Sequence, residues 1–363
     1  MGASVPASTL GITSYRWSND FKSMLMLAAF PALLMALLAG TMYLFGFASL
    51  DAARGVSVVS PSVFSSLSIK PVLGSLGPED LALSACYAWW PTVLGVAACW
   101  SMVGYAFNGA MIRMATGAKP LARREAPELY NLLENLCISR GMKLPALHII
   151  NTSALNAFAS GLDASSYAVT VTRGLVERLD KRELEAVLGH ELTHIINKDC
   201  RLLVISIVFT GMISFLAQML WRGMQFGMHG RTGRSDDGRG QGRGGANIAL
   251  LMIISAVMLA VGYVLAILLR FALSRRREYM ADAGAVELTK DPEAMISALR
   301  KISGASEIPD VPPEVRQMFI ENPPSVFDIG GLFATHPPIE NRIVALQRLG
   351  GLPPEGKSLI PEA

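Results

Sequence analysis

Four apolar runs, each long enough to cross a lipid bilayer as a helix, divide this chain of 363 residues. They are Met24–Phe45, Pro91–Ile112, Leu202–Leu220 and Ile248–Leu269. A helix needs about 20 apolar residues to span the hydrocarbon core of a bilayer. The composition agrees, because 51% of the residues are hydrophobic, 17% are charged and the mean hydropathy is +0.38. We therefore expect a multi-pass integral membrane protein.

The basic residues beside the first two runs predict which side of the membrane holds the rest of the chain. Arg16 and Lys22 precede the first run, which is too long for a signal peptide and is interpreted as an uncleaved anchor. Four basic residues follow the second run, namely Arg113, Lys119, Arg123 and Arg124. The segment between the two runs contains only Arg54 and Lys70. By the positive-inside rule, residues 113–201 are expected in the cytoplasm.

The loop between the third and fourth runs disagrees with this rule. It carries five arginines, namely Arg222, Arg231, Arg234, Arg239 and Arg243, against Asp236 and Asp237. If both runs span, this basic loop lies outside; the alternative is a hairpin that enters the bilayer without crossing it. In either arrangement, residue 270 lies on the same side of the membrane as residue 201. The glycine-rich loop is interpreted as a flexible linker, with contact to anionic lipid as the alternative.

The runs predict five segments. They are an N-terminal cytoplasmic segment (1–23), a transmembrane hairpin (24–112) with an outer loop (46–90), the first part of a cytoplasmic domain (113–201), a second hydrophobic hairpin (202–269) with a Gly/Arg-rich loop (222–246), and the second part of the cytoplasmic domain (270–363). A net charge of +3 is too small to indicate nucleic acid as a partner. The four cysteines are widely spaced and suggest neither a disulfide framework nor a cysteine metal site.

The first part of the cytoplasmic domain has a pattern of one helix, three short strands and a second helix. Leucine spacing predicts a helix over Ala126–Arg140, and the strands are expected at Ala146–Asn151, Ala154–Ser160 and Tyr167–Thr172. Asp180 is a good N-cap, and Glu183 stands where a capping box needs it. We therefore expect an α+β integral membrane protein, in which four predominantly helical membrane segments join a mainly helical domain with a small β-sheet.

The second helix carries His190-Glu191-Leu192-Thr193-His194, an H-E-x-x-H sequence. On a helix, His190 and His194 lie one turn apart on the same face and can bind one metal ion, while Glu191 lies close enough to act on water at that ion. This pattern is typical of a zinc hydrolase, most often a metalloprotease. The alternative is a pair of surface histidines on a polar helix.

Two histidines leave a catalytic zinc site one protein ligand short. No third histidine follows at the spacing that some zinc proteases use; Asn197 and Asp199 stand in that neighbourhood. Glu278 and Asp282 follow the fourth apolar run at positions i and i+4, so one helix can present both carboxylates. One would bind zinc, and the other would accept a hydrogen bond from a ligating histidine. The alternative is that Glu278 pairs with neighbouring arginines on a solvated surface.

Four motifs, in order, resemble those of the membrane gluzincin proteases of family M48, most closely the heat-shock membrane protease HtpX group. They are Asn156-Ala157-Phe158-Ala159-Ser160-Gly161, the H-E-x-x-H sequence with Asn197 and Asp199, Arg276-Arg277-Glu278-Tyr279-Met280-Ala281-Asp282, and Thr335-His336-Pro337-Pro338 with Glu340 and Arg342. The resemblance covers roughly residues 120–350 and the layout of the four runs. The N-terminal extension ahead of Lys22 and the stretch Leu50–Asp80 are longer than the family pattern.

The resemblance implies roles for individual residues. It implies that one zinc ion per chain is bound by His190, His194 and Glu278, with Glu191 as the general base. It further places Asp282 and Asn197 beside the ligands, and implies that the strand Asn156, Ala157, Phe158, Ala159 and Ser160 holds an extended polypeptide by strand addition. His336 and Arg342 are expected to stabilise the oxyanion or to order the site; the alternative for His336 is a capping residue at a helix start.

The resulting interpretation is a zinc endopeptidase of the bacterial cytoplasmic membrane. Its site would face the cytoplasm, and its polypeptide substrates would be misfolded or damaged membrane proteins within the lipid bilayer. Nothing in the sequence indicates an oligomeric state. One alternative is a protease that processes prenylated proteins, although such relatives carry more hydrophobic spans. The other is a zinc-stabilised scaffold without catalysis, against which the presence of Glu191 argues, because a structural zinc site needs no base.

Overall fold

The computed structural model describes residues 7–55, 77–229, 276–309, 311–316, 318–321 and 336–353, together with parts of 252–262. The chain divides into two compact units. The first unit contains residues 1–24, 103–207 and 269–363, and the second contains residues 25–102 and 208–268. The first unit therefore contains the H-E-x-x-H sequence, and the second contains most of the apolar runs.

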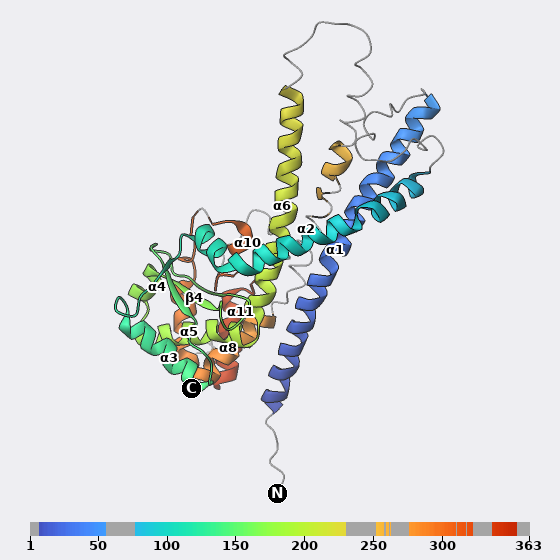
Figure 1. Cartoon of the computed structure of the whole chain (residues 1–363). Helices are drawn as coiled ribbons and strands as arrows, with labels where there is room; N and C mark the ends of the chain where they lie inside the picture. The colour runs from blue at the N-terminus through green and yellow to red at the C-terminus, as the bar shows by residue number, and fades with distance from the viewer. Residues whose placement is uncertain are drawn as a thin grey trace, which may run out of the picture. The chain divides into compact units, whose positions relative to one another are not determined.

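The first unit is built around a small mixed sheet (Figure 1). Its strands are β1 (Lys119–Pro120), β2 (Ala146–Ile150), β3 (Ala157–Ser160) and β4 (Ala168–Thr172), in the order β1-β2-β4-β3. β2 and β4 are parallel, whereas β3 runs antiparallel to β4 and lies at the edge of the sheet. The three strands expected from the sequence are confirmed. The middle one begins at Ala157 instead of Ala154, because the N–H of Leu155 donates to the carbonyl of Ala305 and leaves the ladder.

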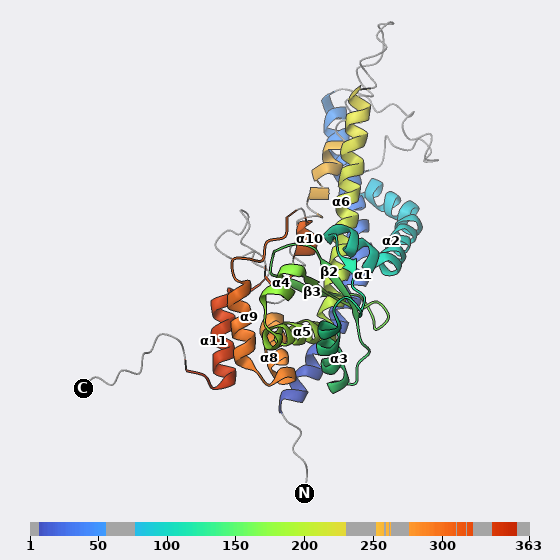
Figure 2. The same cartoon turned by 90° about the vertical axis from the view of Figure 1, so that its left-hand side faces the viewer.

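Two helices of the first unit, α3 (Pro127–Ser139) and α5 (Lys181–Ile196), correspond to the two expected in the first part of the domain. This unit also contains α4 (Arg173–Arg178), α8 (Arg276–Thr289), α9 (Pro292–Ile302), α10 (Pro313–Arg316) and α11 (Ile339–Gly350). α5 begins with the expected capping box: Asp180 Oδ1 accepts from the N–H of Glu183 at 2.9 Å, and Glu183 Oε2 accepts from the N–H of Asp180 at 2.8 Å. α5 packs against α8 and α9, and Figure 2 shows α8, α9 and α11 side by side.

α5 and α8 approach each other closely because small residues line their contact. A Cβ atom added at Gly284 would overlap the side chain of Thr193, and one added at Gly189 would lie 3.5 Å from Cα of Ala285. Ala281 and Ala285 are fully buried. This short separation allows side chains of α8 to reach the histidines of α5.

The second unit contains the long parts of α1 (Ala7–Gly55), α2 (Pro78–Thr116) and α6 (Asp199–His229). Within this unit Phe30 stacks on Phe209, with ring centroids 4.1 Å apart, and Trp100 Nε1 donates to the carbonyl of Val208 at 2.9 Å. Among the residues that the structure describes, two helices are long and apolar enough to cross a membrane, Trp17–Gly46 and Pro78–Thr116.

The helices are longer than the apolar runs that predicted them. α1 ends at Gly55 and α2 begins at Pro78, so the expected outer loop 46–90 is partly helical. Likewise, α6 contains the third run and continues to His229, into the expected loop 222–246. The fourth run lies largely outside the described residues. Hydropathy marks the part of a helix that suits the bilayer, but not the polar turns by which the helix continues beyond it.

Candidate metal centre

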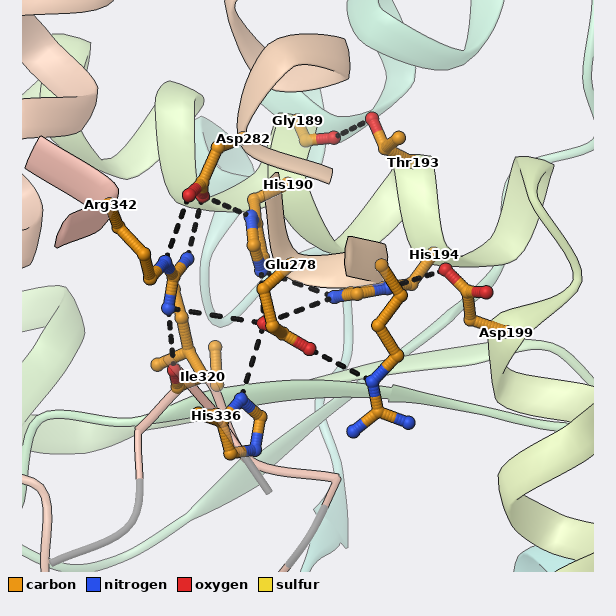
Figure 3. A network of polar contacts seen from close by, with 12 residues as sticks. Gly189, His190, Thr193, His194, Asp199, Glu278, Asp282, Ile320, His336 and Arg342 are labelled. Carbon is orange, nitrogen blue, oxygen red and sulfur yellow. Dashed lines mark hydrogen bonds and ion pairs between the residues drawn. The ribbon is translucent and has the colours of Figure 1, made fainter. Parts of the chain in front are cut away.

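Three side chains from α5 and α8 converge at one point (Figure 3). Nε2 of His190 lies 3.2 Å from Nε2 of His194. Oε2 of Glu278 lies 3.7 Å from the first of these nitrogens and 3.9 Å from the second. The sequence left open whether Glu278 or Asp282 joins the histidines, and the structure places Glu278 in this cluster.

The separations suit a zinc ion. Zinc–ligand distances of about 2.0–2.2 Å in a tetrahedron put neighbouring ligand atoms roughly 3.3–3.6 Å apart. Oε2 of Glu278 is buried, and among the described residues it has no hydrogen-bond partner. Although burial raises its pKa, the nearby His336, His194 and Arg277 side chains hold the pKa of Glu278 well below its usual range. A buried, ionised carboxylate oxygen beside two imidazole nitrogens is therefore a ligand set that fits zinc.

Each histidine is oriented by a carboxylate on its other ring nitrogen. Nδ1 of His190 lies 3.0 Å from Oδ1 of Asp282, and Nδ1 of His194 lies 2.9 Å from Oδ2 of Asp199. Such partners fix the tautomer and turn Nε2 toward the metal position. Burial lowers the pKa of His190 to about 4, although the neighbouring Asp282 carboxylate, toward which Nδ1 points, acts to raise it. The imidazole is therefore neutral, as a metal ligand must be.

Arg342 lies behind Asp282 and is completely buried. Its Nε and Nη2 atoms donate to the two oxygens of Asp282 at 2.9 and 2.6 Å. Its Nη1 atom donates to the carbonyl of Ile320 at 3.0 Å and lies 3.9 Å from Oε2 of Glu278. The guanidinium is thus held by Asp282 and by the backbone, and it contacts the cluster from the side of α11.

Glu191 is buried beside the cluster, and neither carboxylate oxygen makes a hydrogen bond of ordinary geometry with the described residues. Burial raises the pKa of Glu191 to about 7, against the lowering effect of His194 and of the nearby Ala159 backbone. A carboxylate that has no protein partner and a pKa near neutrality can both take up and release a proton.

His336 also reaches the cluster, from the segment just before α11. Its Nδ1 lies 3.2 Å from Oε2 of Glu278, and neither ring nitrogen has a hydrogen-bond partner among the described residues. The N-cap of α11 is Pro338, and no side chain caps it. His336 therefore does not cap that helix, which was one of its two expected roles.

The segment expected to hold substrate already uses some of its hydrogen-bonding groups within the protein. Asn156 is fully buried; its Nδ2 donates to the carbonyls of Ser306 and Glu321, and its Oδ1 accepts from the N–H of Ile320 at 3.1 Å. The N–H of Ile320 also lies 3.0 Å from the carbonyl of Ala157. The side chain of Asn156 thus ties the start of β3 to residues 306–321.

The other four residues of that segment, Ala157–Ser160, form β3. In the antiparallel register Phe158 pairs with Thr170 and Ser160 with Ala168. The N–H of Thr172 donates to the carbonyl of Asn156, so even-numbered residues of β3 bond to β4. By alternation, the backbone groups of Ala159 point away from β4, toward the outer edge.

Three further residues belong to the site but were not expected there. Arg277 is buried and donates from Nε to Oε1 of Glu278 at 3.0 Å. In the sequence, the charge of this arginine had been an argument for a solvated surface at this position. Asp199 was noted only as part of a motif. Asn19 contacts both Asp199 and the carbonyl of Asn197, the buried C-cap of α5. No local pattern links Asn19 to a residue so distant in sequence.

Comparison with known proteins agrees with this geometry. The model of peptidase family M48 matches residues 123–349. A protease HtpX homologue of Bacteroides fragilis is 47% identical over 264 residues, which cover 71% of this chain and 80% of the relative. A protease HtpX homologue of Ligilactobacillus salivarius is 38% identical over 257 residues, which cover 71% of this chain and 84% of the relative. The crystal structure of S. mikatae Ste24p is similar with a TM-score of 0.43 at 20% identity, over 82% of this chain and 64% of that chain. The chain therefore belongs to peptidase family M48, as a metallopeptidase of the HtpX-like group.

Proposed function

We propose that this metallopeptidase is a zinc-dependent endopeptidase that faces the cytoplasm and degrades misfolded or damaged membrane proteins. The observation that carries the proposal is the cluster of His190, His194 and Glu278, with the Glu191 carboxylate beside it free of hydrogen bonds of ordinary geometry to the described residues. A purely structural zinc site is closed by four protein ligands and needs no neighbouring base. This site offers three ligands and a base, which is the composition of a hydrolytic site.

His190, His194 and Glu278 would hold the zinc ion, which would supply a Lewis acid for the attacking water and for the scissile carbonyl. Glu191 takes the proton of the attacking water on its carboxylate and later delivers it to the leaving amine. His336, whose ring nitrogens have no protein hydrogen bond among the described residues, donates to the developing oxyanion. Arg342 orders the site through Asp282 and does not contact the reacting carbonyl.

The substrate would lie along the outer edge of β3. Strand addition uses the backbone groups of the edge and requires no particular sequence, which suits a protease of misfolded chains. Because Ile320 already occupies the carbonyl of Ala157, the pairing would centre on Ala159, the residue of β3 next to Glu191. Asn156 contributes by holding the edge in place, and Phe158 and Ser160 bond to the inner strand.

The membrane and the cytoplasmic orientation are supported by the two apolar helices and by the basic residues that follow α2 in sequence. Membrane-protein substrates are supported by a protease unit joined directly to such helices. The orientation is tested by protease protection of a tag placed after Ala363. In intact spheroplasts the tag is expected to be protected, and its digestion from outside would contradict the cytoplasmic assignment.

The activity is tested with purified wild type and Glu191→Gln in detergent. Zinc content and cleavage of an unfolded model protein are measured for both, with Glu185→Gln, a change on the same helix, as the control. We expect about one zinc ion per chain in all three proteins and a loss of cleavage of at least 100-fold only in Glu191→Gln. Zinc-loaded wild type that cleaves neither the unfolded protein nor a misfolded membrane protein would instead favour a scaffold.

A further inference from the structure

We infer that Asn19, on the N-terminal helix α1, is a positioning residue for the metal ligand His194 and acts through Asp199. Nδ2 of Asn19 donates to Oδ1 of Asp199 at 2.8 Å and to the carbonyl of Asn197 at 2.9 Å. The other carboxylate oxygen of Asp199 lies 2.9 Å from Nδ1 of His194. A continuous chain of polar contacts thus runs from the N-terminal helix to the metal position, within the first unit of the chain.

Burial makes this chain of contacts rigid. Asn19 is 1% exposed and Asp199 is 2% exposed, so water does not compete for these hydrogen bonds. An amide nitrogen has two hydrogens, and the two contacts of Asn19 use both of them. Hydrogen bonds in such a low-dielectric setting strengthen one another. Asn19 therefore fixes which way the Asp199 carboxylate turns, and Asp199 fixes the tautomer and ring orientation of His194.

Asp20, the next residue of α1, forms ion pairs with residues of the turn between α5 and α6 and of the start of α6. Oδ2 of Asp20 lies 2.5 Å from Nζ of Lys198, and its Oδ1 lies 3.4 Å from Nη1 of Arg201. Lys198 has a φ of 61°, a left-handed conformation that is unfavourable for a residue with a side chain. The turn between α5 and α6 is thus held in an unfavourable conformation by contacts on both sides of it. Asn19 and Asp20 together form what we call the α1 clamp.

The α1 clamp gives the N-terminal extension a function besides anchoring. A residue that only fixed a helix to its neighbour could bond to any carbonyl of the turn. Asn19 bonds instead to the carboxylate that orients a metal ligand, as well as to a carbonyl. Displacement of α1 would therefore remove a hydrogen-bond donor from Asp199 and weaken metal binding, even where the protease unit stays folded.

The inference rests on the proposed role of His194 as a zinc ligand, and its test measures zinc binding directly. Full-length wild type, Asn19→Leu and Ser18→Ala are purified in detergent, and their zinc affinity is measured by competition with a chelator of known affinity. Asn19→Leu removes both N–H donors and keeps the same branched shape and number of side-chain heavy atoms. Ser18 is adjacent on α1, and its side chain makes no hydrogen bond among the described residues. We expect Asn19→Leu to bind zinc about 10-fold more weakly, and Ser18→Ala to bind it as wild type does.

A double-mutant cycle distinguishes positioning from helix anchoring. Because Asn19 acts through Asp199, Asn19→Leu should weaken zinc binding no further in a chain that already carries Asp199→Ala. Effects that multiply would mean that Asn19 acts independently of Asp199, and would overturn the inference. Unchanged zinc affinity in a folded Asn19→Leu protein would overturn it equally.

Kinetics of the zinc-saturated enzymes provide a second readout. A misoriented His194 lowers kcat, whereas the substrate edge at β3 is untouched, so KM should stay the same.

If Asn19→Leu fails to fold, Asn19→Ser is measured in its place, since serine is smaller and keeps a single donor. We expect this variant to have an intermediate zinc affinity, and wild-type affinity would count against the inference. Wild type that binds no zinc would refute the proposed function itself, whereas zinc-binding wild type with an unaffected Asn19→Leu refutes the α1 clamp alone.

Discussion

Arg342 and Asp282 form a bidentate ion pair in which neither side chain reaches solvent. Two guanidinium nitrogens donate to the two carboxylate oxygens at 2.9 and 2.6 Å, and the same carboxylate lies 3.0 Å from Nδ1 of His190. The arginine comes from α11 and the aspartate from α8, so the pair joins the last described helix to the metal centre. Of the two roles expected for Arg342, stabilising the oxyanion or ordering the site, these contacts favour the second, because they support the carboxylate beside His190.

We predict that Arg342→Ala destabilises the fold by about 3–5 kcal/mol, because it leaves the Asp282 charge buried without its partner. Arg342→Lys keeps the charge but not the planar pair of donors, and should fall between Ala and wild type. Chemical denaturation measures both, with Arg348→Ala on the exposed side of α11 as the control. Zinc affinity should fall together with stability. A stable Arg342→Ala protein that retains zinc and loses only kcat would favour the direct oxyanion role.

His336 gives a contrasting prediction. Its Nδ1 lies 3.2 Å from Oε2 of Glu278, but its ring makes no hydrogen bond of ordinary geometry to a described residue, so its removal should leave the fold in place. We expect the metal to stay as well, because bound zinc would itself keep Glu278 ionised. We predict that His336→Asn lowers kcat by about 100-fold or more, the usual effect of removing an oxyanion donor. Steady-state kinetics and zinc content are measured together, with Glu340→Gln on α11 as the control. Loss of zinc with the loss of kcat would show that His336 supports the metal.

Gly284 lies at the contact of α5 with α8, and we predict that its substitution lowers the stability of the fold. A Cβ at Gly284 would overlap Thr193, so Gly284→Ala should push the helices apart and cost about 1–3 kcal/mol. Because Glu278 reaches the histidines across this contact, zinc affinity should fall as well. The added change Thr193→Ala removes the overlapping atoms and should restore part of both losses. Equal loss in the single and double variants would place the cause elsewhere.

The sequence predicted what depends on neighbours along the chain. The capping box of α5 and the one-turn spacing of His190 and His194 are local, and both are seen in the structure. The motif around Glu278 also placed a carboxylate near the histidines. For the capping box and the two histidines, the spacing within one helix determines the geometry. Glu278 lies on another helix, α8, and its place near the histidines was expected from the resemblance to a family motif.

The contacts that cross between elements could not be predicted in this way. Asn156 was expected to bind substrate, yet its amide donates to the carbonyls of Ser306 and Glu321, which follow it by 150 and 165 residues. Asn19 donates to Asp199, which follows it by 180 residues. A buried asparagine and an exposed one look alike in sequence, because burial is decided by packing among distant segments. Side-chain partners of this kind require the structure.

The capping box of α5 leads to a prediction on pH. Glu183 bonds to Ser297 and Lys301 of α9, both at 2.6 Å, in addition to the N–H of Asp180. Burial alone would raise its pKa, but these partners lower the pKa of Glu183 below its ordinary value in the folded protein. Its contribution to stability is therefore complete above the unfolded pKa, about 4.5, and is lost as pH falls through the lower, folded pKa.

Glu183→Gln isolates this contribution. At pH 7 the variant should be less stable than wild type by about 1–3 kcal/mol, the usual value of hydrogen bonds to a charged group. The difference in stability should shrink as the pH is lowered below about 4.5, since protonation removes the negative charge of Glu183 from wild type. The substitution has already removed this charge from the variant. Denaturation across pH 3–7 measures both proteins, with Glu177→Gln on the exposed surface of α4 as the control. A difference that stays constant with pH would mean that Glu183 stabilises α5 by packing and not by its charge.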